Sequence, residues 1–230
     1  MFIFFDPTFW IFMVPAMLIG IWAQIKVTTA YHKYKQVRVA RGLTGYDAAR
    51  AILNANGLYD VRIEKIAGEM TDHFDPRANV VRLSADVYDK ASVASVGIAA
   101  HECGHAVQYA KGYTPMKIRG ALVGATNFSS LFSMMFVILG VVFANPLLAY
   151  FGVGLFAVVA LFQLITLPVE FNASNRALEQ MEAMGIVADD NEARGAKKVL
   201  SAAALTYVAA LASAVATLIR IFAMRGRSRD

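Results

Sequence analysis

Long runs of apolar residues, separated by shorter polar stretches, dominate the chain. Each run is close to the roughly 20 residues that a helix needs to cross the core of a bilayer. Four such runs are present: 8–25, 120–144, 147–169 and 199–224. The composition, 57% hydrophobic and 17% charged, is also that of a membrane protein. The pattern predicts a mainly α-helical integral membrane protein with three to four membrane helices.

One polar region of useful size lies between the first two apolar runs. Thr44 is a candidate N-cap and Gly57 a candidate stop for a helix between them. Residues 61–68 resemble a strand, and 73–84 read as a turn that leads into another strand. The second strand, 79–84, is either a sheet edge or an ordinary internal strand. At about 90 residues, this region can form a small α+β core that packs on the membrane helices.

These signals divide the chain into five segments. Because no Lys or Arg precedes the first apolar run, we interpret this run as a retained anchor and not as a cleaved signal peptide. The last segment is rich in alanine, and it either crosses the membrane or packs within the protein. The expected segments are an anchor (1–26), a cytoplasmic α+β region (27–117), a transmembrane hairpin (118–169), a cytoplasmic helix (170–198), and an apolar helix with a basic tail (199–230).

The positions of the basic residues predict the orientation. None of the 22 Lys and Arg residues lies before Lys26 or between Gly120 and Asn175. By the positive-inside rule, 26–119 and 170–198 face the cytoplasm of a multi-pass protein in the inner (cytoplasmic) membrane. A full crossing by the last apolar run would place the four arginines of the tail outside, so the course of this run stays open.

The candidate chemistry lies in the sequence HECGH, residues 101–105. The whole chain has only four histidines, and two of them flank a glutamate here. Ser92 or Ser95 can cap a helix that runs through this sequence to Lys111. The motif therefore lies on a predicted helix.

On such a helix His101 and His105 lie one turn apart on the same face. Two imidazoles in this arrangement can share a zinc ion, while Glu102 reaches a water in the open position as a general base. The alternative is a buried helix whose histidines are hydrogen-bonded to backbone carbonyls. The lone Cys103 excludes an internal disulfide, and its position on the helix indicates packing and not metal binding.

A third ligand must come from elsewhere, and Glu170 is the only charged residue between Gly120 and Asn175. It follows Pro168, and we expect it to open a helix that stops at Gly185. Taken alone, it could be an interfacial carboxylate at a helix N-terminus. Together with two imidazoles and a water, it completes the His₂Glu set of catalytic zinc sites, which is the gluzincin pattern. We expect one Zn²⁺ per chain.

Four stretches of the chain resemble the YugP-like membrane zinc metallopeptidases of bacteria, distant relatives of HtpX and of the CAAX prenyl protease. The resemblance extends over essentially the whole chain. It implies His101, His105 and Glu170 as zinc ligands, Glu102 as the catalytic base, and a small gluzincin-like α+β peptidase domain. The four stretches are DHFDPRANVVRLS (72–84), AAHECGHAVQ (99–108), LFQLITLPVEFNASNRAL (161–178) and GAKKVLSAAALTYVAA (195–210).

The chain departs from HtpX-type enzymes at one position. Those enzymes have an aspartate four residues after the third ligand, where this chain has Ser174. That aspartate steadies a liganding histidine, and in this chain the role either passes to Ser174 or Asn175 or is absent. A further donor usually stabilises the oxyanion. The candidates are His73, Tyr113 and Arg176, although His73 can equally be a surface residue and Arg176 a charge near lipid headgroups.

The function that follows is that of a zinc-dependent metalloendopeptidase that acts on membrane or membrane-proximal polypeptides. The alternatives are a zinc-binding membrane scaffold or adaptor without catalysis, and a metal-dependent hydrolase of a non-peptide bond. The net charge of +5 includes a basic cluster beside the first apolar run, which indicates membrane lipids and not nucleic acid as partner. No sequence feature indicates an oligomeric state.

Overall fold

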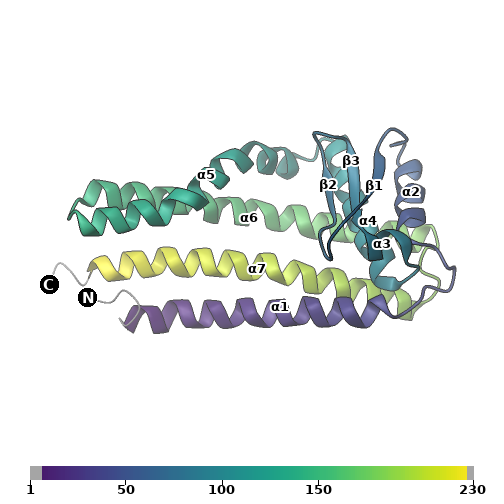
Figure 1. Ribbon diagram of the computed structural model, residues 1–230, viewed down its shortest axis with the longest axis horizontal. Helices are drawn as coiled ribbons and strands as arrows, with labels where there is room; N and C mark the ends of the chain where they lie inside the picture. Colours follow the sequence, from purple (N-terminus) through teal and green to yellow (C-terminus); the bar gives the residue numbers. More distant parts are fainter. Residues whose placement is uncertain (1–6, 227–230) are drawn as a thin grey trace. The chain divides into compact units, whose positions relative to one another are not determined.

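A computed structural model describes residues 7–226 (Figure 1). Its internal contacts divide the chain into two compact units. The first, here called the helical unit, comprises Met1–Gln24, Ile118–Leu167 and Thr206–Asp230. The second, here called the α+β unit, comprises Ile25–Lys117 and Pro168–Leu205.

Four helices in the described part of the chain are long and apolar enough to cross a membrane. Together with a small mixed sheet, they confirm the predicted class of a mainly helical membrane protein. A π-helical turn, η1 (Phe9–Met13), precedes the first of them. The four are α1 (Val14–Lys35), α5 (Thr114–Val142), α6 (Pro146–Ala183) and α7 (Asp190–Gly226).

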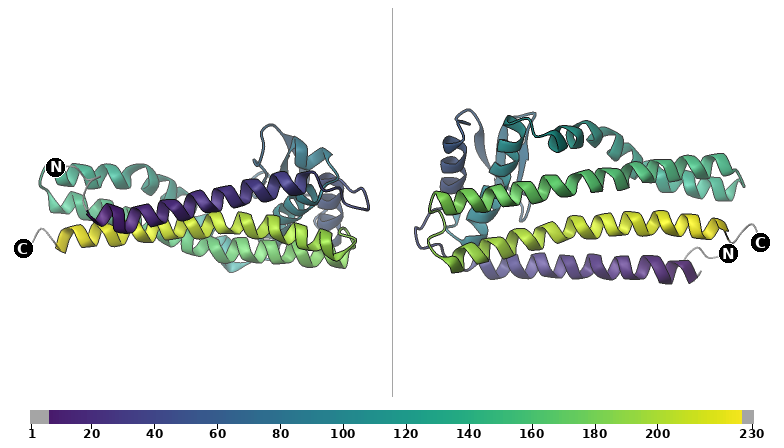
Figure 2. Two further views of the ribbon diagram at one scale, coloured as in Figure 1. Left: turned by 90° about the horizontal axis from the view of Figure 1, so that it is seen from below. Right: turned by 180° about the vertical axis from the view of Figure 1, so that it is seen from behind.

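Within the helical unit, α5 and the first part of α6 form an antiparallel hairpin (Figure 2). Two glycines let the helices approach closely. A Cβ atom on Gly140 would lie 2.4 Å from the backbone nitrogen of Ala149, and one on Gly152 would lie 2.6 Å from that of Val137. Small residues at such contacts are typical of helices that pack inside membranes.

In the α+β unit, α2 (Gly45–Ala55) has the predicted N-cap. The Thr44 side chain accepts from the backbone N–H of Asp47, and the Asp47 carboxylate accepts from the backbone N–H of Thr44. This reciprocal pair is a capping box, which satisfies two backbone donors at the helix start. Gly57, at φ 73°, follows the helix end as predicted.

The sheet has the strand order β1–β3–β2, from β1 (Arg62–Ile66), β2 (His73–Asp75) and β3 (Val80–Ser84). β3 pairs in parallel with β1 and antiparallel with β2, and it is almost entirely buried. The strand predicted at 79–84 is therefore internal, and its interpretation as an edge is wrong. The strands on either side of it are the edges: β1, which the pattern predicted, and β2, a three-residue strand that the pattern did not reveal.

The motif helix is α4 (Val93–Ala110), preceded by the short α3 (Ala85–Asp89). Of the two predicted caps, Ser92 is the one used: its Oγ accepts from the N–H of Ser95 at 3.1 Å. Lys111 caps the other end, and Gly112 follows at φ 65°. α4 packs on α2, α3 and the sheet around a common core (Figure 1).

One expected helix start and one expected segment boundary differ from the structure. No new helix opens at Glu170, because α6 continues through Pro168 as far as Ala183. Proline removes one N–H from the helix ladder, but long apolar helices tolerate this where neighbouring groups satisfy the freed carbonyl. The boundary expected between residues 198 and 199 likewise lies inside α7. The stop at Gly185 is confirmed, since it follows the end of α6 with φ 61°.

Candidate metal centre

His101 and His105 of α4 and Glu170 of α6 form a cluster in which each residue offers one ligand atom, all within 4.8 Å of one another. We call these three residues the ligand cluster. Glu170 Oε2 lies 3.2 Å from His101 Nε2 and 3.5 Å from His105 Nε2. Zinc bonds of about 2.0–2.2 Å in a tetrahedron separate neighbouring ligand atoms by about 3.3 Å. The donor set and its spacing therefore fit a zinc ion.

Close packing between α4 and α6 brings the ligand cluster together. A Cβ atom on Gly104 would lie 2.7 Å from the carbonyl oxygen of Ala173, so glycine is needed where the two helices touch. Glu170 and His105 are buried, with 2% and 6% exposure, whereas the side chain of His101 is 15% exposed. The cluster is thus reached from the His101 side.

The second ring nitrogen of each histidine contacts a polar side chain. His101 Nδ1 lies 3.1 Å from Ser174 Oγ, and His105 Nδ1 lies 3.0 Å from Gln108 Oε1. Such contacts leave the Nε2 atoms directed at the ligand cluster and restrain the rings. Of the two residues considered for this role, Ser174 lies at the cluster. Asn175 is exposed and lines a separate groove between α6 and α7.

The electrostatic field at the ligand cluster favours a cation. Burial alone would lower the pKa of His105, but the hydrogen bond that its ring donates to Glu170 and the charges of Glu102 and Glu170 outweigh it, so this pKa is raised. The negative field that favours an imidazolium also favours a divalent cation, which competes with the proton for the same nitrogen.

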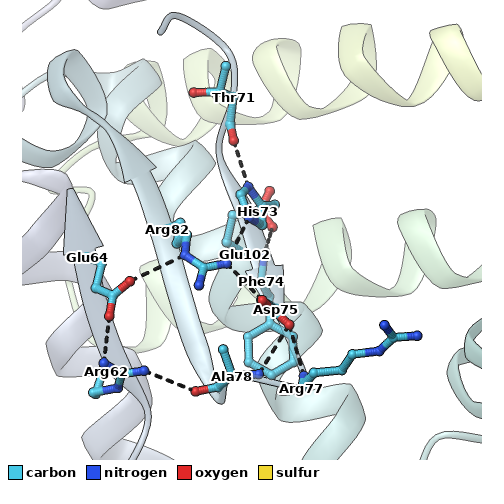
Figure 3. A network of polar contacts seen from close by, with 10 residues as sticks. All are labelled: Arg62, Glu64, Thr71, His73, Phe74, Asp75, Arg77, Ala78, Arg82 and Glu102. Carbon is cyan, nitrogen blue, oxygen red and sulfur yellow. Dashed lines mark hydrogen bonds and ion pairs between the residues drawn. The ribbon is translucent and has the colours of Figure 1, made fainter. Parts of the chain in front are cut away.

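Glu102 lies outside the ligand cluster, although it is the next residue after His101. Its Oε2 accepts a hydrogen bond of 3.0 Å from the backbone N–H of Phe74 on the edge strand β2 (Figure 3). The Phe74 ring packs near Tyr109, at the end of α4, with a centroid separation of 6.0 Å. Glu102 is only 8% exposed. A buried carboxylate outside the ligand cluster is therefore fixed against the edge strand, and its charge acts on His105.

The side chain of His73 lies on the face of β2 opposite the Phe74 side chain. Side chains alternate along a strand, so His73 and Asp75 point away from the side that Phe74 faces. There, His73 Nδ1 lies 2.8 Å from the carbonyl oxygen of Thr71, and Asp75 forms a 2.8 Å ion pair with Arg82 (Figure 3). We therefore leave His73 out of the mechanism.

The other two oxyanion candidates lie near the ends of α4 and α6. The backbone N–H of Tyr113 donates to the carbonyl of Gln108 at 2.9 Å, which closes the last turn of α4. Arg176 Nε donates to Asn172 Oδ1 at 2.8 Å, and Gln108 Nε2 donates to the same oxygen at 3.0 Å. Arg176 is thus linked to the cluster through other side chains.

The sequence analysis missed Gln108 and Asn172. The available signal was the spacing of Gln108, three residues after His105 and hence on the same face of α4. Cys103, as predicted, is a packing residue. It is fully buried, its Sγ lies 3.6 Å from the carbonyl oxygen of Ala49, and burial raises the pKa of its thiol.

A helix with two histidines one turn apart, a glutamate from a second helix and four apolar helices are features of a membrane zinc metallopeptidase. The chain belongs to the family described as "Putative neutral zinc metallopeptidase", whose model matches residues 9–226. It is 42% identical over 217 residues to the "Putative membrane protease YugP" of Bacillus subtilis (strain 168), covering 94% of this chain and 96% of that protein. No solved structure gave a significant match. The resemblance noted in the sequence is confirmed.

Proposed function

We propose that this protein is an integral membrane zinc metalloendopeptidase of the gluzincin type. In this proposal His101, His105 and Glu170 hold one zinc ion per chain, and Glu102 is the general base. One observation carries the proposal: three ligand atoms converge within 4.8 Å, while Glu102, whose charge acts on His105, is held by the N–H of Phe74. Three protein ligands leave a fourth position for water, as in catalytic and not in structural zinc sites.

Zinc bound by such a set acts as a Lewis acid that lowers the pKa of a water toward about 7 and polarises a carbonyl group. Glu102 supplies the proton transfers. Its Oε2 is hydrogen-bonded to Phe74, so Oε1 is the oxygen free to take a proton from the attacking water. The same carboxyl group then gives the proton to the leaving amine, which balances the hydrolysis.

Polypeptide substrates are supported by the position of β2. It forms one edge of the sheet, and the backbone N–H of Phe74 on it donates to Glu102, which places this edge against the proposed base. An edge of this kind can pair with an extended polypeptide through main-chain hydrogen bonds, largely regardless of sequence. Because the chain has four candidate membrane spans, we expect its substrates to be membrane or membrane-proximal polypeptides.

The distribution of charge supports an active site on the cytoplasmic face of the cell membrane. Of the 22 Lys and Arg residues, 18 lie in 26–119 and 176–198, the segments that carry the site, four lie in the C-terminal tail, and none lies in 120–175. By the positive-inside rule, segments rich in Lys and Arg stay on the cytoplasmic side. The basic residues around Lys33 and Arg38 would then meet anionic lipid headgroups.

The test uses the full-length protein purified in detergent. Its zinc content is measured together with cleavage of an unfolded, fluorescently labelled polypeptide. The proposal predicts about one zinc per chain, loss of cleavage when a chelator removes the metal, and recovery when zinc is restored. A protein that binds no zinc, or cleavage that survives complete removal of metal, would refute it.

A further inference from the structure

We infer that a relay of three side chains, Arg176, Asn172 and Gln108, fixes the tautomer of His105 so that its Nε2 carries the lone pair directed at the ligand cluster. The inference rests on the proposed function, because it assigns these residues as positioning residues for a zinc ligand. It follows from which atoms can only donate and which can only accept a hydrogen bond.

The relay begins at Arg176, whose guanidinium can only donate. Its Nε lies 2.8 Å from Asn172 Oδ1, so the oxygen of this amide faces the arginine. The same oxygen lies 3.0 Å from the side-chain amide of Gln108. An amide oxygen can only accept, so the Gln108 atom on this side must be the NH₂ group.

The backbone of α6 imposes the same orientation on Gln108. The carbonyl oxygen of Val169, which can only accept, lies 2.8 Å from Gln108 Nε2. Both N–H bonds of Gln108 are therefore used. A flipped amide would place its oxygen against two other oxygens, those of Val169 and Asn172. The oxygens of Val169 and Asn172 thus each identify the Gln108 atom that faces them as the nitrogen. This orientation of the amide does not depend on His105.

The oxygen of Gln108 is left facing His105, with Oε1 3.0 Å from Nδ1. Because this oxygen can only accept, Nδ1 of His105 carries the proton. In the neutral ring Nε2, on the far side, is then unprotonated, and it lies 3.5 Å from Glu170 Oε2. A lone pair and a carboxylate that face each other at this distance form a site for a cation.

Burial protects the His105 end of the relay from water, whereas Asn172 and Arg176 are half-buried. Gln108 and Val169 are both 0% exposed. The other histidine has a different partner: His101 Nδ1 contacts the hydroxyl of Ser174, which can either donate or accept. The relay therefore singles out His105. Because Val169 directly precedes Glu170, Gln108 also ties the Glu170 turn of α6 to α4.

Gln108→Met is the direct test, because methionine has a similar length but neither donor nor acceptor of comparable strength. We expect zinc affinity, measured by competition with a chromophoric chelator, to fall about 10–100-fold, as when other outer partners of metal ligands are lost. The matched control is Gln180→Met on the same helix as Glu170. Gln180 accepts from Asn56 outside the relay, so its replacement should leave zinc affinity unchanged.

A second variant keeps the test decisive if Gln108→Met fails to fold. Asn172→Leu removes one acceptor of the relay and should also weaken zinc binding, by a smaller factor. In the Gln108→Met background it should cause no further loss, because the relay is already broken. If the two residues instead acted independently on the structure, the fold-losses in zinc affinity of the two single variants would multiply in the double variant.

The tautomer can be read directly from ¹⁵N-histidine NMR of the zinc-free protein at alkaline pH, with His105→Gln used for assignment. The inference predicts a protonated Nδ1 in the wild-type protein and a mixture of tautomers in Gln108→Met. It is overturned if Nε2 carries the proton in the wild type, or if a folded Gln108→Met binds zinc as tightly as the wild type. If the wild type binds no zinc, the proposed function fails, and the NMR result still judges the relay.

Discussion

Gly104 of α4 faces Ala173 of α6 so closely that a Cβ atom on Gly104 would lie 2.7 Å from the Ala173 carbonyl oxygen. The contact lies between the two elements that supply the metal ligands. His105 follows Gly104 in the chain, and Glu170 lies one turn before Ala173. The separation of the two helices, and with it the spacing of the ligand cluster, depends on the absence of this one side chain.

Gly104→Ala should therefore push α4 away from α6. Overpacking of this kind costs about 1–3 kcal/mol, and the larger helix separation should also weaken zinc binding. Thermal unfolding and chelator competition measure the two effects. Gly97→Ala on the same helix is the control, because its Cβ would meet Ala196 at an ordinary 3.6 Å. If both variants behave alike, the close contact does not set the site.

Glu170→Gln should largely abolish zinc binding, because a neutral amide is a poor zinc ligand compared with a carboxylate. Zinc affinity should fall by more than the approximately 10–100-fold loss that is expected when a residue hydrogen-bonded to a metal ligand is removed. Glu179→Gln, nine residues later on the same helix and exposed, should bind zinc like the wild type. Metal analysis after dialysis measures both, and full retention of zinc by Glu170→Gln would rule out the proposed ligand set.

At neutral pH we expect the wild-type protein, which has Asp72, to be less stable than the Asp72→Asn variant. Burial raises the pKa of Asp72 despite the hydrogen bonds from Ser84. Above this raised pKa the ionised carboxylate destabilises the fold. The penalty diminishes as pH falls through the folded pKa toward the unfolded value of about 3.9. Asp72→Asn keeps the oxygen that accepts from Ser84 and removes the penalty.

We therefore expect the melting temperature of Asp72→Asn to exceed that of the wild type more at pH 7.5 than at pH 5. Comparing the two proteins cancels the opposite contributions of Asp75 and Asp86, whose pKa values are lowered and which both proteins share. An equal difference at the two pH values would contradict this account of Asp72.

The parts of the fold that the sequence predicts are those with local causes. Thr44 and Ser92 cap their helices through contacts with residues three positions later. The two histidines share a face because they are four residues apart. The third ligand was found by a different route, since Glu170 is an isolated charge in a long apolar stretch.

The parts that the sequence did not predict depend on partners far along the chain. β2 has three residues, too few for a pattern, and it is a strand only because it pairs with β3. Gln108 and Asn172 are 64 residues apart, and their contact exists only because α4 and α6 pack together. Pro168 predicted a break, but α6 continues through it, which a local rule for proline misses.

The most direct test of the central claim is to measure zinc content and polypeptide cleavage on the same preparations of the wild type and Glu102→Gln. The amide can still accept from the N–H of Phe74 but cannot take a proton from water. The account predicts equal zinc in both proteins and a loss of cleavage of at least about 10²-fold in the variant. Equal cleavage by both proteins, or stoichiometric zinc with cleavage by neither, would contradict it, and the second result would favour a zinc-binding scaffold.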